Sequence, residues 1–116
     1  MLVSIISVAF NSEKTIARTI ESVFRQSYTN IEYIIVDGAS KDNTLAIAQK
    51  YQKLFDETDG RSLKIISEPD NGMYDALNKG AKLAHGELVG QINTDDWYED
   101  DAVETMVNLY KDREYD

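Results

Sequence analysis

The sequence predicts an α/β domain built on a mostly parallel sheet with helices on both faces. Short apolar runs rich in β-branched residues alternate along the chain with longer segments whose apolar residues recur at helical spacing. Strands and helices that alternate in this way form parallel sheets, because each crossover helix returns the chain to the same edge. The 116 residues fit one domain, and 42% hydrophobic residues with a single proline argue against disorder.

Four segments have the composition of strands. The first reads LVSIISVA and the second IEYIIV, and both are rich in β-branched residues, as buried strands are. Asp37-Gly38 ends the second segment, and a polar loop over residues 56–62 precedes the third. The strands are expected at residues 2–9, 31–36, 63–66 and 87–92.

Amphipathic helices are expected after the first two strands. Asn11 and Ser12 offer N-caps to the first helix, and Ser40 offers one to the second. Apolar residues that recur every three or four positions define one buried face on each helix. These faces comprise Ile16, Ile20, Val23 and Phe24 in the first, and Leu45, Ala48, Tyr51 and Phe55 in the second.

A third helix follows the dense turn signal EPDNG at residues 68–72. Its face includes small residues such as Gly80, which allow close packing against the sheet. We expect this helix to end at His85-Gly86, with Gly86 as a left-handed cap and His85 interacting with the last carbonyls. A final helix is expected over residues 100–112.

The composition excludes several classes of protein. The net charge of −9 argues against nucleic acid as a partner, because phosphate backbones need clustered Lys and Arg. The absence of cysteine excludes disulfides, iron–sulfur clusters and thiolate zinc, and the single histidine excludes a multi-histidine metal site. The apolar run from Val3 to Phe10 is far shorter than the roughly 20 residues that span a bilayer. No secretory signal follows Met1, so we expect a cytoplasmic protein.

Residues suited to ligand binding follow each predicted strand. Ligands of open parallel sheets bind outside the carboxyl ends of the strands. Phe10-Asn11 follows the first strand, Asp37 the second, residues 68–72 the third and Asp95-Asp96 the fourth. If the strands are parallel, all four groups lie along one edge of the sheet.

Asp95 and Asp96 are the candidate metal ligands. Two carboxylates in a loop can hold a hard divalent cation and leave positions open for water or phosphate oxygens. The alternative is that these acids, with Asp100 and Asp101, only favour the start of the last helix through its dipole. Trp97 beside them is suited either to stack on a sugar ring or to fill the core.

Asp37 and Lys79 each allow two interpretations. A carboxylate at Asp37 can accept a hydrogen bond from the imide N–H of a base such as uracil, or it can bond its own turn. Lys79 can meet a diphosphate as a point charge, or it can lie on a solvated helix face. The turn after Asp37 lacks the glycine and lysine spacing of a phosphate-binding loop.

Five segments together carry a recognisable set of motifs. Residues 3–11 read VSIISVAFN, a strand that ends in an aromatic-Asn pair, and residues 22–28 read SVFRQSY. Residues 34–44 read IIVDGASKDNT, and residues 67–80 read SEPDNGMYDALNKG. With the NTDD segment at residues 93–96, they resemble the Rossmann-like, nucleotide-binding N-terminal half of a GT-A-fold glycosyltransferase of family 2.

The match covers nearly the whole chain. The family's patterns S-V-x-x-Q-x-(Y/F) and V-D-(D/G)-x-S-x-D-x-T correspond to residues 22–28 and 36–44. Residues 67–80 are similar to a subset found among bacterial polysaccharide-assembly transferases. Val8 stands where the family usually has Pro, and Asn93 where many members carry the first Asp of the metal-binding loop.

The resemblance implies a role for each candidate residue. Phe10, with Asn11 beside it, would pack against the base, and Asp37 would hydrogen-bond to it. Asp75 and Lys79 would border the nucleotide diphosphate. Asp95 and Asp96 would bind the ribose–diphosphate region and Mn²⁺ or Mg²⁺. We expect Asp96 to be the direct metal ligand.

The resemblance also implies what lies outside residues 1–116. Family members continue with acceptor-side strands and a general-base carboxylate, so the catalytic base of an inverting transfer is expected beyond residue 116. The chain is thus interpreted as the N-terminal, nucleotide-sugar-binding part of a truncated domain. Its expected partners are a nucleotide-sugar donor, for which UDP is the expected nucleotide, and a saccharide or lipid-linked acceptor. If the acceptor is lipid-linked, the full-length protein is expected to associate peripherally with the membrane.

Two alternatives belong to other functional classes. The chain could bind a nucleotide without catalysis and self-associate as a homo-oligomer, since an uncovered sheet edge invites pairing with another chain. A receiver-like domain shares the alternating pattern, but its acid pair would follow the first strand, where Asn11 and Ser12 stand.

Overall fold

The structure, a computed structural model, describes residues 1–114. Its sheet has four parallel strands in the order β3-β2-β1-β4. The strands are β1 (Val3–Ala9), β2 (Ile31–Asp37), β3 (Arg61–Ser67) and β4 (Leu88–Gln91). The predicted parallel sheet is therefore confirmed, and the buried β1 and β2 lie at its centre.

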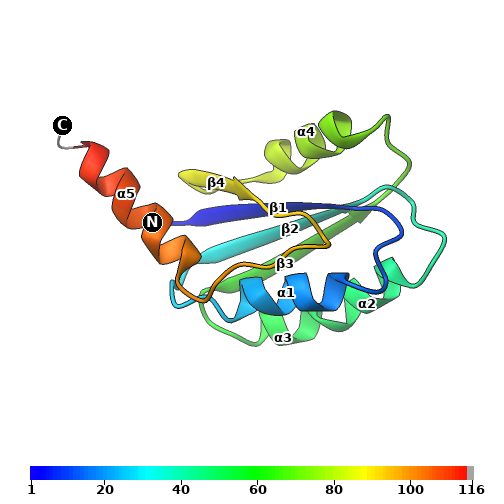
Figure 1. The fold of residues 1–116 in the computed structure, drawn as a ribbon, viewed down its shortest axis with the longest axis horizontal. Helices are drawn as coiled ribbons and strands as arrows, with labels where there is room; N and C mark the ends of the chain where they lie inside the picture. The colour runs from blue at the N-terminus through cyan, green and yellow to red at the C-terminus, as the bar shows by residue number, and fades with distance from the viewer. Residues whose placement is uncertain (115–116) are drawn as a thin grey trace.

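Helices cover both faces of the sheet, as predicted (Figure 1). One face carries α1 (Ile16–Phe24), α2 (Thr44–Lys50) and α3 (Gln52–Asp56), while α4 (Met73–Leu83) lies on the other. The last helix, α5 (Ala102–Glu114), extends from the end of the sheet at which β1 begins. Within residues 1–114, no helix combines the length and apolar character needed to cross a membrane.

The two faces bury cores of different size. The larger core joins the first three helices to the sheet around Tyr33 and Phe55 and also takes in Val103 of α5. The smaller core packs α4 on Ile6 and its neighbours on β2. Gly80 allows this close approach, because a Cβ there would lie 2.7 Å from Cγ2 of Ile6.

Some element boundaries differ from the prediction. β3 begins at Arg61 rather than Leu63, because Arg61 pairs with Ile31 and its guanidinium donates to the carbonyls of Phe24 and Gln26. These contacts are long-range and leave no apolar pattern in the sequence. The second predicted helix is divided into α2 and α3 at Tyr51.

The predicted helix caps are wrong. Thr15 rather than Asn11 or Ser12 precedes α1, and Asn43 rather than Ser40 precedes α2. The backbone N–H of Thr44 instead donates to Oδ1 of Asp42 at 3.0 Å. Several adjacent positions carry short polar side chains that could cap a helix, so the sequence alone does not determine where each helix begins.

The predicted end of α4 is also wrong. The helix ends at Leu83, and Gly86 does not adopt a left-handed conformation. Gly86 is needed for space instead, because a Cβ there would lie 2.6 Å from the backbone nitrogen of Ser4. His85 turns away from the helix end, and its Nδ1 lies 2.8 Å from Oε2 of Glu32.

Glu32 is a buried carboxylate that anchors the connection between α4 and β4. Its Oε1 accepts hydrogen bonds from Ser4 Oγ and from the His85 backbone N–H, both at 2.8 Å. Burial by itself raises the pKa of Glu32, but the hydrogen bonds from the backbone and side chain of His85 and from Ser4 outweigh it. The pKa of Glu32 is therefore lowered in the folded protein.

Candidate functional site

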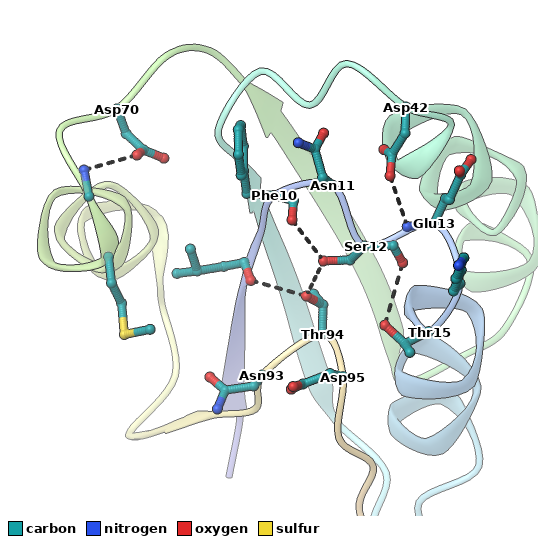
Figure 2. Close-up of a pocket in the computed structure, with 14 residues that line it drawn as sticks. Phe10, Asn11, Ser12, Glu13, Thr15, Asp42, Asp70, Asn93, Thr94 and Asp95 are labelled. Carbon is teal, nitrogen blue, oxygen red and sulfur yellow. Dashed lines mark hydrogen bonds between the residues drawn. The ribbon is translucent and has the colours of Figure 1, made fainter.

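A pocket of about 860 Å³ opens at the carboxyl ends of β1 and β4 (Figure 2). This volume lies within the range of roughly 300–1,000 Å³ that is usual for sites of small ligands and cofactors. Residues that follow β1 and β4, the turn before α4 and the loop before α2 form its walls. Segments that follow all four strands therefore converge on one site, as expected for an open parallel sheet.

The loop after β1 supplies an exposed aromatic ring and a fixed backbone. Phe10 leaves 60% of its surface open, although it borders the pocket. Asn11 adopts a left-handed conformation with φ of 49°. Its N–H donates to Ser40 Oγ at 2.8 Å, and its Oδ1 accepts from the N–H of Lys41 at 2.9 Å. Asn11 thereby ties the loop after β1 to the loop after β2.

Thr94 joins the ends of β1 and β4 and was not singled out from the sequence. It is buried, and its Oγ1 forms a hydrogen bond with Ser12 Oγ at 2.7 Å. The N–H of Ser12 in turn donates to Oγ1 of Thr44 at 2.7 Å. The only signal in the sequence was a polar residue in the loop after the fourth predicted strand.

Asp95 and Asp96 are both exposed, but they face different surroundings. Asp95 lines the pocket, whereas Oδ1 of Asp96 accepts the backbone N–H of Trp97 at 2.9 Å. No group of three or more candidate metal ligands occurs in the part of the chain that the structure describes. Carboxylate oxygens are nevertheless the type of ligand that Mg²⁺ and Mn²⁺ prefer, and these ions keep open positions for water and phosphate oxygens.

Trp97 lies at the surface, with one face of its indole ring covered by Arg18. The guanidinium carbon of Arg18 on α1 lies 3.4 Å from its ring centroid, and the side chain remains 44% exposed. This cation–π contact holds the loop of Asp95 and Asp96 against α1. The Thr19 hydroxyl adds a second tie by donating to the backbone oxygen of Asp96.

Asp37 lies at the end of β2 behind the pocket, where it is 1% exposed. Its Oδ1 accepts from Ser40 Oγ at 2.5 Å, and its Oδ2 accepts from Ser67 Oγ at 2.8 Å and Ser40 N–H at 3.1 Å. Both oxygens are thus used to join β2, β3 and the following turn. Asp37 is not among the residues that line the pocket.

Lys79 and Asp75 belong to an ion cluster on α4. Lys79 Nζ lies 3.0 Å from Glu68 Oε1 and 3.6 Å from Asp75 Oδ2, and it donates to the Pro69 oxygen at 3.1 Å. The hydrogen bond to Glu68 leads the interactions that raise the pKa of Lys79. The backbone N–H of Asn71, followed by Lys79, holds the pKa of Asp75 below its usual value.

The structure thus brings together only some of the predicted site residues. Phe10, Asn11 and Asp95 line the pocket, whereas the other predicted residues, Asp37, Asp75, Lys79 and Asp96, do not. Chemically, the pocket offers an aromatic surface near one wall and carboxylates near another. This combination suits a ligand with a planar ring and a phosphate-bound cation.

The comparisons with known proteins agree with this geometry. The family model described as glycosyl transferase family 2 matches residues 4–116. A chondroitin synthase of Escherichia coli is 34% identical over 110 residues, which cover 95% of this chain and 15% of that protein. This chain therefore spans a small part of that relative.

Two solved structures share the fold. Staphylococcus aureus TarS, residues 1–349, in complex with UDP-GlcNAc, has a TM-score of 0.85 and 27% identity over 97% of this chain and 32% of that one. The mannosyltransferase PcManGT of Pyrobaculum calidifontis, in complex with GDP-Man and Mn²⁺, has a TM-score of 0.80 and 25% identity over 94% of this chain and 31% of that one. These neighbours confirm the predicted Rossmann-like part of a GT-A fold.

Proposed function

Because this chain belongs to glycosyl transferase family 2, we propose that it binds the nucleotide-sugar donor of a sugar transfer in bacterial polysaccharide synthesis. The donor is UDP-linked, and the acceptor is a saccharide or a lipid-linked saccharide. One observation carries the proposal, namely the pocket at the strand ends with Phe10 and Asp95 among its walls. The TarS neighbour, whose complex contains UDP-GlcNAc, supports UDP as the nucleotide.

The transfer inverts the anomeric centre. An acceptor hydroxyl attacks the anomeric carbon in line, the bond to the diphosphate oxygen breaks, and UDP leaves. A carboxylate beyond residue 116 takes the hydroxyl proton, as in general-base catalysis. Within the described residues, the chain's task is to bind and orient the donor.

Asp95 and Asp96 would hold Mn²⁺ or Mg²⁺ in this proposal. When bound, such a cation offsets the negative charge that develops on the leaving diphosphate. The cation–π contact between Arg18 and Trp97 positions the loop that carries both carboxylates. The Mn²⁺ in the PcManGT complex supports this choice of metal.

A calorimetric titration of UDP into the chain, with and without Mn²⁺, tests the proposal. We expect binding that strengthens with Mn²⁺ and loses this strengthening in Asp95→Asn or Asp96→Asn. Asp101→Asn, a nearby exposed acid outside the pocket, is the matched control. Heat that does not depend on Mn²⁺ would contradict the metal assignment, and no binding by the folded chain would contradict the proposal as a whole.

Three expectations from the sequence stay predictions. They are the cytoplasmic location, the peripheral membrane association and the self-association through a sheet edge. β4 is an edge strand of the described sheet, and Val89 on it is 53% exposed. Sedimentation at high concentration tests the last of them, because a strictly monomeric chain would exclude self-association through that strand.

A further inference from the structure

Thr94 is a buried residue at the wall of the pocket, one position before Asp95. Its Oγ1 lies 2.7 Å from Oγ of Ser12 and 3.4 Å from the backbone oxygen of Val8. Oγ of Ser12 also lies 3.2 Å from the backbone oxygen of Phe10. Figure 2 shows these contacts as one hydrogen-bonded path that ties the loop after β4 to the end of β1 and to the loop that follows it.

Both hydroxyl groups are needed for this path, because each carries a single proton. If Thr94 donates to Ser12, the proton of Ser12 goes to the Phe10 oxygen at 3.2 Å. In the opposite direction Ser12 donates to Thr94, and Thr94 donates to the Val8 oxygen at the longer distance of 3.4 Å. Removing either hydroxyl group therefore breaks the link between the two loops.

Ser12 is itself held by the loop before α2. Its backbone N–H donates to Oγ1 of the buried Thr44 at 2.7 Å, and the Thr44 hydroxyl donates to Oδ1 of Asp42. Oδ2 of Asp42 accepts the backbone N–H of Glu13 at 3.3 Å. The loops after β1 and β2 thus form one hydrogen-bonded support, and Thr94 contacts this support through Ser12.

The other side of Asp95 is held by α1. The Thr19 hydroxyl donates to the backbone oxygen of Asp96, and the Arg18 guanidinium covers Trp97. The Asp95 carboxylate itself has no hydrogen-bond partner among residues 1–114, although it lines the pocket. Its position therefore depends on the two anchors of the loop, one before it in the sequence and one after it.

We infer that Thr94 and Ser12 are positioning residues that hold the Asp95 carboxylate where it can bind the divalent cation. Their hydroxyl groups act through the backbone of the loop rather than on the ion. Groups that orient a ligating side chain contribute about 10–100-fold to metal affinity, because the site is then arranged before the metal arrives. This inference rests on the proposed function and adds to it the residues that prepare its metal site.

The test follows calorimetric binding of UDP to the 116-residue chain over a series of free Mn²⁺ concentrations. The Mn²⁺ concentration that gives half of the strengthening, the midpoint, reports the affinity of the site for the metal. Thr94→Val keeps the shape of the side chain without its hydroxyl. We expect Thr94→Val and Ser12→Ala each to raise the midpoint by about 10–100-fold.

Two further variants separate positioning from packing. Thr94→Ser retains the hydroxyl group, so its midpoint should stay within about twofold of the wild type. The double variant Ser12→Ala/Thr94→Val should shift the midpoint no further than Thr94→Val alone, because both substitutions break the same path. Thr105→Val is the matched control, since Thr105 is exposed on α5 and lies outside the pocket, and it should leave the midpoint unchanged. Urea unfolding establishes that each variant is folded, and Ser12→Ala carries the test if Thr94→Val is not.

Midpoints within about twofold of the wild type for both Thr94→Val and Ser12→Ala would overturn the inference and leave the proposed function intact. So would a loss of UDP affinity that is equal at every Mn²⁺ concentration, because the hydroxyl groups would then only stabilise the pocket. A wild type that binds UDP without responding to Mn²⁺ overturns the inference together with the metal assignment. Failure of the folded wild type to bind UDP overturns the proposed function as well.

Discussion

Replacing Gln26 with alanine should destabilise the fold through the segment that leads from the pocket to α5. The Gln26 side chain is buried, and its Nε2 donates to the backbone oxygens of Ser22 at 2.9 Å and Glu99 at 2.7 Å. Its Oε1 accepts the backbone N–H of Val103 at 3.0 Å. One side chain therefore joins α1 to the start of α5.

The expected loss of stability follows from the groups left without partners. A buried backbone group that loses its hydrogen bond costs about 1–3 kcal/mol. The N–H of Val103 is buried and bears this full cost, whereas the carbonyl of the exposed Glu99 can turn to water. Gln26→Ala should therefore lower the free energy of unfolding by about 2–4 kcal/mol. This is a large share of the roughly 6–17 kcal/mol typical of a chain of this length.

Urea unfolding followed by circular dichroism measures this change. Gln49→Ala is the matched control, because Gln49 is exposed on α2 and should change the free energy of unfolding by no more than about 0.5 kcal/mol. A loss below about 1 kcal/mol for Gln26→Ala would refute the reasoning. It would mean that packing of α5, rather than this hydrogen-bond set, holds the segment.

Three further substitutions test other contacts. Gly86→Ala should lower the free energy of unfolding by about 1–3 kcal/mol, because its Cβ would meet the Ser4 backbone; unchanged urea unfolding would contradict this. The pKa of Glu32 is lowered on folding, so its carboxylate stabilises the fold above about pH 4.5, and this contribution disappears as the pH falls through the folded-state pKa. In thermal melts, the melting temperature of Glu32→Gln should therefore depend less on pH than that of the wild type below pH 4.5. Identical profiles for the two proteins would contradict this role of Glu32. Arg18→Ala should increase exposure of Trp97 and shift its fluorescence to the red, an effect that should be absent in Arg25→Ala.

The central part of the fold could be predicted from the sequence because it depends on local patterns. Buried strands such as β2 are rich in β-branched residues, and α1 repeats its apolar residues at helical spacing. The order of these elements then implies a parallel sheet. The extra residues of β3 could not be predicted, because Arg61 belongs to the strand only through pairing with Ile31 and contacts with distant carbonyls.

The candidate site was predicted in its position and only partly in its residues. The strand-end rule correctly brings Phe10, Asn11 and Asp95 to one pocket. It does not say which carboxylates line the pocket. Asp37 lies at the end of a strand, but both of its carboxylate oxygens accept hydrogen bonds from Ser40 and Ser67. Asp70 lines the pocket from the turn before α4. That difference depends on the space above Gly38, which only the folded chain reveals.

The most direct test of the account is to locate UDP on the chain by amide chemical-shift mapping. With UDP and Mn²⁺, we expect the largest shifts at the pocket, in Phe10, Asn11, Gly72 and Asp95. Residues of the second hollow, between β4 and α5, serve as the internal control and should not move; they include Leu88 and Met106. Shifts confined to that second hollow, or spread evenly over the fold, would contradict a nucleotide site at the carboxyl ends of the strands.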